Sequence, residues 1–79
     1  MKDKRELIIV TVLYGSDELI GKWSCPEFGT IEVTGENFED LRDEFKFVLE
    51  ETINNKVEVG YYVPHWLKTH NYDIKYSYR

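Results

Sequence analysis

The residue types in this chain that can do chemistry are two histidines, one cysteine and many carboxylates. His65 and His70 are five residues apart, which does not match the i, i+4 pair of a helical zinc site, and Cys25 is remote from both. We therefore expect solvated histidines in a loop and a buried or half-buried thiol at a strand end. The chain also contains no glycine-rich phosphate loop. These observations favour a protein without a metal, a cofactor or a catalytic site.

The carboxylates are concentrated in one segment that also carries a basic Arg42 and Lys46. Hard-cation sites need oxygen ligands that converge from several elements, whereas this segment is predicted to be a single helix. A solvated acidic face is therefore favoured over a metal site. The acidic residues of this segment are Glu36, Glu39, Asp40, Asp43, Glu44, Glu50 and Glu51.

Phe47 is the exception on this acidic face. At 100° per residue it points about 180° away from the centre of the helix's apolar stripe, among Asp43, Glu50 and Glu51. A large aromatic side chain surrounded by carboxylates is a candidate hot spot for a basic, partly apolar partner. The alternative is that residues 57–66 fold back and cover Phe47. The sequence does not decide between these two interpretations.

The elements that position these residues follow from hydrophobic periodicity. Residues 7–14 are β-branched and apolar on both alternating faces, which predicts a strand with neighbours on both sides. Residues 19–25 and 30–34 predict two more strands, close enough in sequence to form an antiparallel meander. Asn37 is a good N-cap for a helix that we expect to end at Asn54 and Asn55. Its apolar stripe consists of Phe38, Leu41, Phe45, Val48, Leu49 and Ile53.

The C-terminal part is less regular until its last residues. Residues 57–63 are compatible with an extended segment, and residues 64–67 with one helical turn opened by Pro64. Residues 72–79 alternate cleanly, which predicts a fourth strand with one wet face. A right-handed return from the helix places this strand beside the first. The expected fold is thus a single α+β domain over residues 1–79, ordered β-β-β-α-β, with sheet order 3-2-1-4 and the helix on one face.

Composition limits the function classes. Fifteen acidic against ten basic residues give a formal net charge of −5, so the domain is a poor nucleic-acid binder by itself but suits a basic partner. The single cysteine excludes an intrachain disulfide. The first apolar run is too short for a signal peptide or a membrane span. We expect a soluble, cytoplasmic protein that does not contact membranes.

Two stretches resemble a known family. The segments WSCPEFG (residues 23–29) and GENFEDL (residues 35–41) are similar to the pattern of HicB-type antitoxins, in which a strand ends in Pro-Asp/Glu-Leu-Pro-Gly and Gly-Asp-Thr-Leu-Glu-Glu-Ala opens the helix. The later VPHWL and YDIKY segments resemble the Ile-Pro-x-x-Leu motif and final strand of longer members. This chain departs from the pattern in lacking the second Pro before Gly29 and in having Leu41 where Ala is usual. Many members continue into a DNA-binding segment, so operator binding is not carried over to a chain that stops at Arg79.

The resemblance implies a degenerate, ribonuclease-H-like domain without activity of its own, which binds and occludes a small, basic, RNA-cleaving toxin of the HicA type. Asp43, Phe47, Glu50 and Glu51 are the expected contact residues. Residues 72–79, as an exposed edge strand, are an alternative surface for a homodimer or for strand addition by the partner. A second hypothesis is the sensor or oligomerisation domain of a DNA-binding regulator. An active nuclease is disfavoured because the predicted central strand carries no acidic residue.

Overall fold

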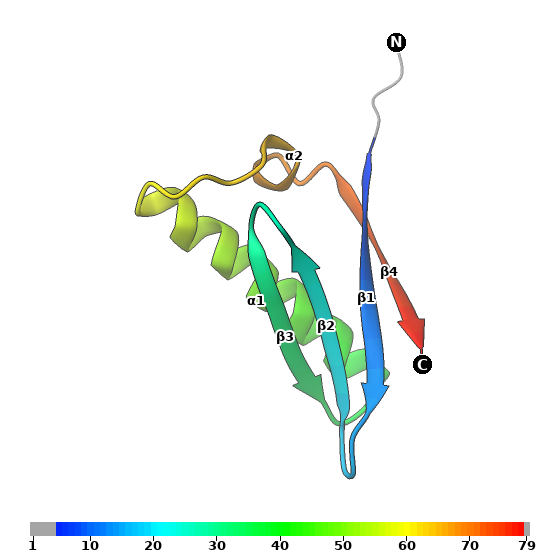
Figure 1. The fold of residues 1–79 in the computed structure, drawn as a ribbon. Coiled ribbons are helices and arrows are strands. Elements are labelled where there is room, and N and C mark those ends of the chain that lie inside the picture. Colours follow the sequence, from blue (N-terminus) through cyan, green and yellow to red (C-terminus); the bar gives the residue numbers. More distant parts are fainter. Residues whose placement is uncertain (1–4, 79) are drawn as a thin grey trace.

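The computed structural model describes residues 5–78 and shows a four-stranded sheet with one long helix across it (Figure 1). The chain order of the elements agrees with the predicted β-β-β-α-β arrangement, and the helical turn expected after Pro64 is present as a short helix before the last strand. The elements are β1 (Glu6–Tyr14), β2 (Leu19–Cys25), β3 (Gly29–Gly35), α1 (Phe38–Glu58), α2 (His65–Lys68) and β4 (Tyr72–Tyr78).

The sheet has the order β3-β2-β1-β4, which confirms the predicted order. β1 pairs with β2 and β2 pairs with β3 in antiparallel register, with Val12 opposite Gly21 and Gly21 opposite Val33. β1 pairs with β4 in parallel register, with Ile8 opposite Ile74. The parallel pair follows from the connection through α1, which returns the chain to the end of the sheet where β1 begins.

The helix covers one face of the sheet. Ile8, Val10 and Val12 of β1 point toward α1 and are fully buried. The alternate residues of the same strand lie on the opposite face, where Leu7 and Ile9 remain 54% and 48% exposed. The apolar character that β1 shows on both faces therefore corresponds to one buried face and one open face.

The start of α1 is fixed by the predicted cap. The Asn37 side chain accepts a hydrogen bond from the backbone N–H of Asp40 at 2.9 Å, which satisfies one of the unpaired donors of the first turn. The residues that point at the sheet follow at helical spacing. The fully or almost fully buried ones are Leu41, Phe45, Leu49 and Ile53.

The predicted end of this helix is wrong. α1 continues through Asn54 and Asn55 to Glu58, and residues 57–63 do not form an extended strand. Asparagine is only slightly less favourable than average within a helix, whereas glycine and proline are strongly unfavourable. The first such residue after Asn37 is Gly60, and this glycine is where the helical path is left.

Gly60 closes α1 with a Schellman motif. Its φ of +90° lies in the left-handed region, which glycine adopts without a side-chain clash. Its N–H donates to the carbonyl of Val57 at 3.2 Å, and the N–H of Tyr61 donates to the carbonyl of Lys56 at 2.9 Å. Two carbonyls that the last turn would leave unpaired are thus satisfied.

The predicted turn after Pro64 is present as α2, and Leu67 from this turn is fully buried. His70 then leads into β4 with a φ of +56°, a conformation uncommon for residues other than glycine. β4 alternates half-buried and exposed residues, as predicted, and position 79 lies outside the described residues. Within residues 5–78, no helix has the length and apolar character needed to cross a membrane.

Candidate functional site

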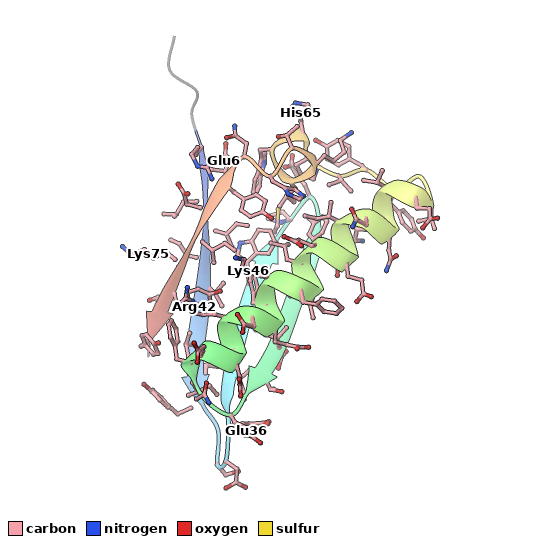
Figure 2. All side chains as sticks on the ribbon, turned by 180° about the vertical axis from the view of Figure 1, so that it is seen from behind. Glu6, Glu36, Arg42, Lys46, His65 and Lys75 are labelled. Atoms are coloured by element: carbon pink, nitrogen blue, oxygen red, sulfur yellow. The ribbon has the colours of Figure 1, made fainter. Side chains whose placement is uncertain are left out.

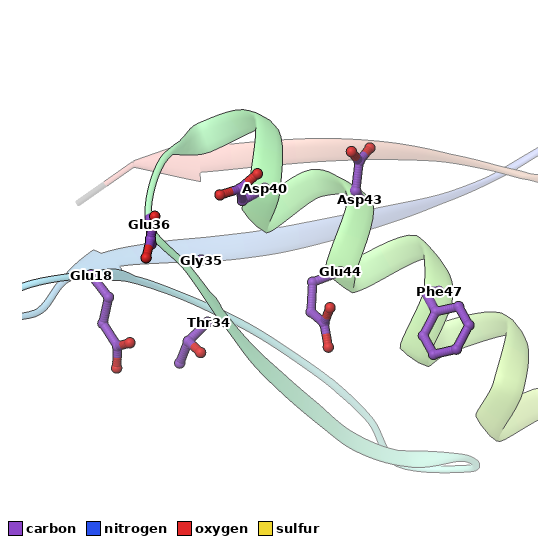
Figure 3. A pocket seen from close by; sticks show the side chains of 8 residues that line it. All are labelled: Glu18, Thr34, Gly35, Glu36, Asp40, Asp43, Glu44 and Phe47. Carbon is purple, nitrogen blue, oxygen red and sulfur yellow. The ribbon is translucent and has the colours of Figure 1, made fainter.

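The acidic cluster and Phe47 border a shallow hollow on the β3 side of α1 (Figure 3). Its side chains come from three separate parts of the chain. The turn between β1 and β2 supplies Glu18, the end of β3 and the following loop supply three residues, and α1 supplies the remainder. We call this surface the acidic hollow; it is lined by Glu18, Thr34, Gly35, Glu36, Asp40, Asp43, Glu44 and Phe47.

The electrostatic character of the acidic hollow is one-sided. Five of its eight lining residues are carboxylates, and the lining residues, all within the described chain, include no Lys, Arg or His. Such a surface carries a strong negative potential, since no neighbouring cation in the lining neutralises the carboxylates. It therefore favours basic ligands.

Phe47 is the apolar component of this surface and is 62% exposed. By contrast Phe45, two residues earlier, is fully buried against the sheet. The alternative in which residues 57–66 cover Phe47 is not what the structure shows. A phenyl ring this exposed contributes little to the stability of the domain, so it is available to a partner.

The four residues predicted to contact a partner are not all part of the acidic hollow. Asp43 and Phe47 line the acidic hollow. Glu50 lines a groove on the other side of α1, and Glu51 is exposed on α1 but lines neither surface. Conversely, Glu18 belongs to the hollow although it lies about 20 residues before the helix; only the hairpin between β1 and β2 brings it there.

The carboxylates do not converge on one point. In Figure 3, Asp43 points away from Glu18 and Glu44. Within residues 5–78, no group of three or more His, Cys, Asp or Glu side chains is arranged to hold a metal ion. Asp73 lies in register with Leu7 on the edge strand β4, and it lines the groove on the other side of α1 together with Glu50 rather than the acidic hollow.

The cysteine and the two histidines do not line the acidic hollow. Cys25 is half-buried at the end of β2, as predicted. His65 opens α2 and His70 precedes β4, and both side chains are exposed. They contribute nothing to the acidic hollow.

The other side of α1 differs in charge. Arg42 and Lys46, labelled in Figure 2, line a groove together with Tyr72 and Tyr76 of β4. We call this surface the β4 groove; it is lined by Arg42, Lys46, Glu50, His70, Tyr72, Asp73, Ile74 and Tyr76. α1 thus presents carboxylates and Phe47 on the β3 side, and two basic residues with Glu50 on the β4 side.

The tyrosines of the β4 groove are held in their neutral form. Partial burial raises the pKa of Tyr72, and the nearby Glu50 carboxylate raises it further. Burial also raises the pKa of Tyr76, an effect that Arg42 opposes and Asp43 reinforces. These hydroxyls serve the groove as hydrogen-bonding groups rather than as charges at neutral pH.

Comparison with known proteins gives no relative for this arrangement: no protein-family model, no curated protein and no solved structure matches the chain. The function must therefore be inferred from the residues and surfaces described above.

Proposed function

We propose that this domain is an antitoxin-like protein-interaction module, acting in the cytoplasm, which binds and masks a small, basic, RNA-cleaving protein of the HicA type. The observation that supports the proposal is the 62% exposure of Phe47 at the border of a hollow lined by five carboxylates and no cation. The resemblance of residues 23–29 and 35–41 to the antitoxin pattern points in the same direction.

The chemistry of the partner explains why these two features belong together. An RNA-cleaving protein needs a basic surface that contacts the phosphates of its substrate. Carboxylates at positions such as Asp43 and Glu44 compete for the same cations and steer the encounter. An exposed aromatic ring such as Phe47 then provides the apolar anchor that long-range attraction alone does not provide.

Masking requires no chemistry from the domain itself. A bound partner whose basic surface is covered cannot reach RNA, so inhibition is steric and electrostatic. In this proposal the domain is not an enzyme and needs neither a metal nor a cofactor. Asp43 and Phe47 are central to the contact, while Glu50 and Glu51 lie at its periphery because they do not line the acidic hollow.

Binding to a candidate partner tests the proposal. If a small basic protein is encoded beside this chain's reading frame, it is the partner to test, and its affinity is measured by isothermal titration calorimetry at two salt concentrations. We expect Phe47→Ala to weaken binding by about 2 kcal/mol, roughly thirtyfold, and Asp43→Lys with Glu44→Lys to reduce its salt dependence.

The matched control is Tyr62→Ala, since Tyr62 is an equally exposed aromatic residue (67%) that does not line the hollow. This variant should bind like the unmodified protein. Unchanged affinity in the Phe47 and Asp43/Glu44 variants, or an equal loss with Tyr62→Ala, would reject the assignment of the surface.

A second candidate function is the oligomerisation domain of a DNA-binding regulator. It is favoured by the position of β4 at the edge of the sheet, where its outer side is available to another strand. A reading frame that continues beyond position 79 into a helix-turn-helix segment would support this function. A frame that ends there, next to a gene for a small basic protein, would support the antitoxin-like function instead.

A further inference from the structure

The outer edge of β4 has a defined hydrogen-bonding pattern. The N–H of Glu6 donates to the carbonyl of Asn71 at 3.2 Å, and Glu6 lies in register with Tyr72. In a parallel pair, alternate residues of a strand direct their backbone groups to the same neighbour. The odd-numbered residues of β4 therefore face β1, and the even-numbered ones, Tyr72, Ile74 and Tyr76, direct their N–H and C=O groups outward. The Arg5 guanidinium donates to the carbonyl of Tyr72 from outside the β1–β4 ladder. This contact agrees with an outward-directed carbonyl at Tyr72.

The sequence of β4 is complementary to itself when it is reversed. If a second β4 runs antiparallel and Ile74 faces its own copy, each Asp73 faces a Lys75 and each Tyr72 faces a Tyr76. Opposite charges and aromatic pairs directly across two strands are stabilising. In this register each residue whose backbone N–H and C=O groups point outward lies opposite another such residue, so the two strands can form hydrogen bonds with each other.

We propose that a second copy of this chain binds along β4, antiparallel and centred on Ile74, so that the two sheets continue across a two-fold axis. The pairing would form about six backbone hydrogen bonds from Tyr72, Ile74 and Tyr76 of each copy. It is an isologous interface, in which each residue of one copy meets its complement in the other. This inference goes beyond the proposed function and does not depend on it.

Two neighbouring registers also place outward-directed residues opposite one another, but both are disfavoured by charge. Moving the two-fold axis by one residue in one direction places Asp73 opposite Asp73 of the second copy. Moving it by one residue in the other direction places Lys75 opposite Lys75. Like charges directly across two strands are destabilising. The charges of β4 therefore select the Ile74-centred register as well as the antiparallel direction.

The surroundings of β4 are compatible with a second copy. The two-fold axis is perpendicular to the sheet, so both copies of α1 lie on the same face. The sides of the helices that approach each other carry Arg42 and Lys46, while the acidic hollows lie at the far ends, beside the two β3 strands. A chain with a net charge of −5 thus meets its copy through a side on which the carboxylates of Glu50 and Asp73 are balanced by Arg42 and Lys46.

Arg5 is the side chain that contacts this edge in the single copy. Its guanidinium lies 3.2 Å from the Asp73 carboxylate and donates to the carbonyl of Tyr72. Both acceptors have a second lone-pair position, so Lys75 and the N–H of Tyr76 from the second copy can be accommodated beside Arg5. The exposed Arg5–Asp73 pair contributes little by itself.

Charge reversal tests both the interface and its register. Sedimentation equilibrium of the chain should show a monomer–dimer equilibrium with a dissociation constant on the order of 100 µM, because one edge strand buries less than a standard interface. Lys75→Asp, which retains the Arg5–Asp73 pair, should weaken the dimer about tenfold or more, and Asp73→Lys should do the same.

An equimolar mixture of these two variants should form a heterodimer with the original affinity, since every charge again faces its opposite. Far-ultraviolet circular dichroism confirms that each variant is folded. A chain that remains monomeric at about 1 mM would overturn the proposal. A dimer that neither variant weakens, or that the mixture does not restore, would overturn it as well.

Hydrogen exchange provides an independent measurement of the register. In the dimer the outward N–H groups of Tyr72, Ile74 and Tyr76 should become protected, whereas those of Asp73 and Lys75 are already protected by β1. NMR spectra of the unmodified chain and of Lys75→Asp, recorded at the same concentration, give this comparison. Protection that does not alternate along β4, or that is equal in the two proteins, contradicts the proposed pairing.

Discussion

Replacement of Gly35 by alanine is expected to destabilise the domain through the backbone of α1. Gly35 is the last residue of β3, and a Cβ atom placed on it would lie 2.6 Å from the backbone nitrogen and 2.8 Å from the Cα of Leu41. The carbonyl carbon of Asp40 would lie at 3.1 Å. Ordinary van der Waals contacts begin at 3.4 Å, so the first turn of α1 has to move away from the sheet.

The size of the expected loss in the free energy of unfolding depends on which atoms have to move. The atoms in contact belong to the backbone of a capped helical turn, which cannot avoid the methyl group by a change of rotamer. Overpacking of this kind costs typically 1–3 kcal/mol, and we expect about 2–3 kcal/mol here because no flexible group can yield. Alanine recovers about 0.5 kcal/mol by restricting the unfolded chain. The net loss of about 2 kcal/mol should lower Tm by about 8–16 °C in a domain of this size.

Thermal denaturation followed by circular dichroism measures this effect, with Gly21→Ala as the matched control. A Cβ on Gly21 would approach only side-chain atoms, the Cγ1 of Val10 at 3.2 Å and the Cδ1 of Leu41 at 3.3 Å. These groups can adjust by small rotations, so the control should lose no more than about 1 kcal/mol. If Gly35→Ala melts within about 2 °C of the unmodified protein, or if Gly21→Ala is the less stable variant, the close approach of α1 to β3 is refuted.

Three further predictions concern the cap, the helix faces and the tyrosines. Asn37→Ala should lower the free energy of unfolding by about 1 kcal/mol, since the cap bond at 2.9 Å is lost, and Asn37→Asp should restore most of it in chemical denaturation. In the same assay Phe47→Ala should change the free energy of unfolding by less than about 0.5 kcal/mol, whereas the buried Phe45→Ala should lose about 3–5 kcal/mol or fail to fold. Tyr72 and Tyr76 should titrate above the ordinary tyrosine pKa of about 10 in ultraviolet absorbance. Because their pKa values are raised on folding, the folded state holds these protons more tightly, so their contribution to stability is complete below pH of about 10 and is lost as the pH rises further; stability that increases there would contradict the assignment.

The sequence predicts the sheet correctly because β3 and β4 alternate in polarity and β1 is rich in β-branched residues. The order 3-2-1-4 followed from the right-handed return and is observed. β1 is apolar on both faces. The sequence pattern therefore could not show that only one of these faces is covered by a helix. In the structure one side carries α1, and the other leaves Leu7 and Ile9 about half exposed.

The end of α1 shows where local propensity misleads. Asn54 and Asn55 suggest a stop because asparagine favours turns, but its cost within a helix is only about a few tenths of a kcal/mol, and tertiary context overrides a preference of this size. The signal that mattered was Gly60, whose positive φ of 90° closes the Schellman motif. A glycine placed just after a helical pattern is the better indicator of a C-terminus.

The acidic hollow was only partly predictable for a different reason. A helical wheel places Asp43, Phe47, Glu50 and Glu51 on one exposed side, and the structure confirms that all four are exposed. It cannot show which neighbouring elements flank that side. β3 and the β1–β2 turn add Glu18 to Asp43 and Phe47, while β4 places Tyr72 beside Glu50. The division of one helix face into two surfaces is a tertiary property.

The two surfaces have a geometric consequence for each other. Pairing along β4 would give a continuous sheet in which the two β3 strands, and with them the two acidic hollows, lie at opposite ends. Each hollow with its Phe47 would remain open, so a dimer would offer two separate binding surfaces for two basic partners. Two basic partners that are linked to each other could occupy both hollows of one dimer. Their effective affinity would then increase without a new contact. Lys75→Asp would then leave the affinity of one partner for one domain unchanged and alter only the stoichiometry of the complex, whereas Phe47→Ala would reduce the affinity and leave the dimer intact.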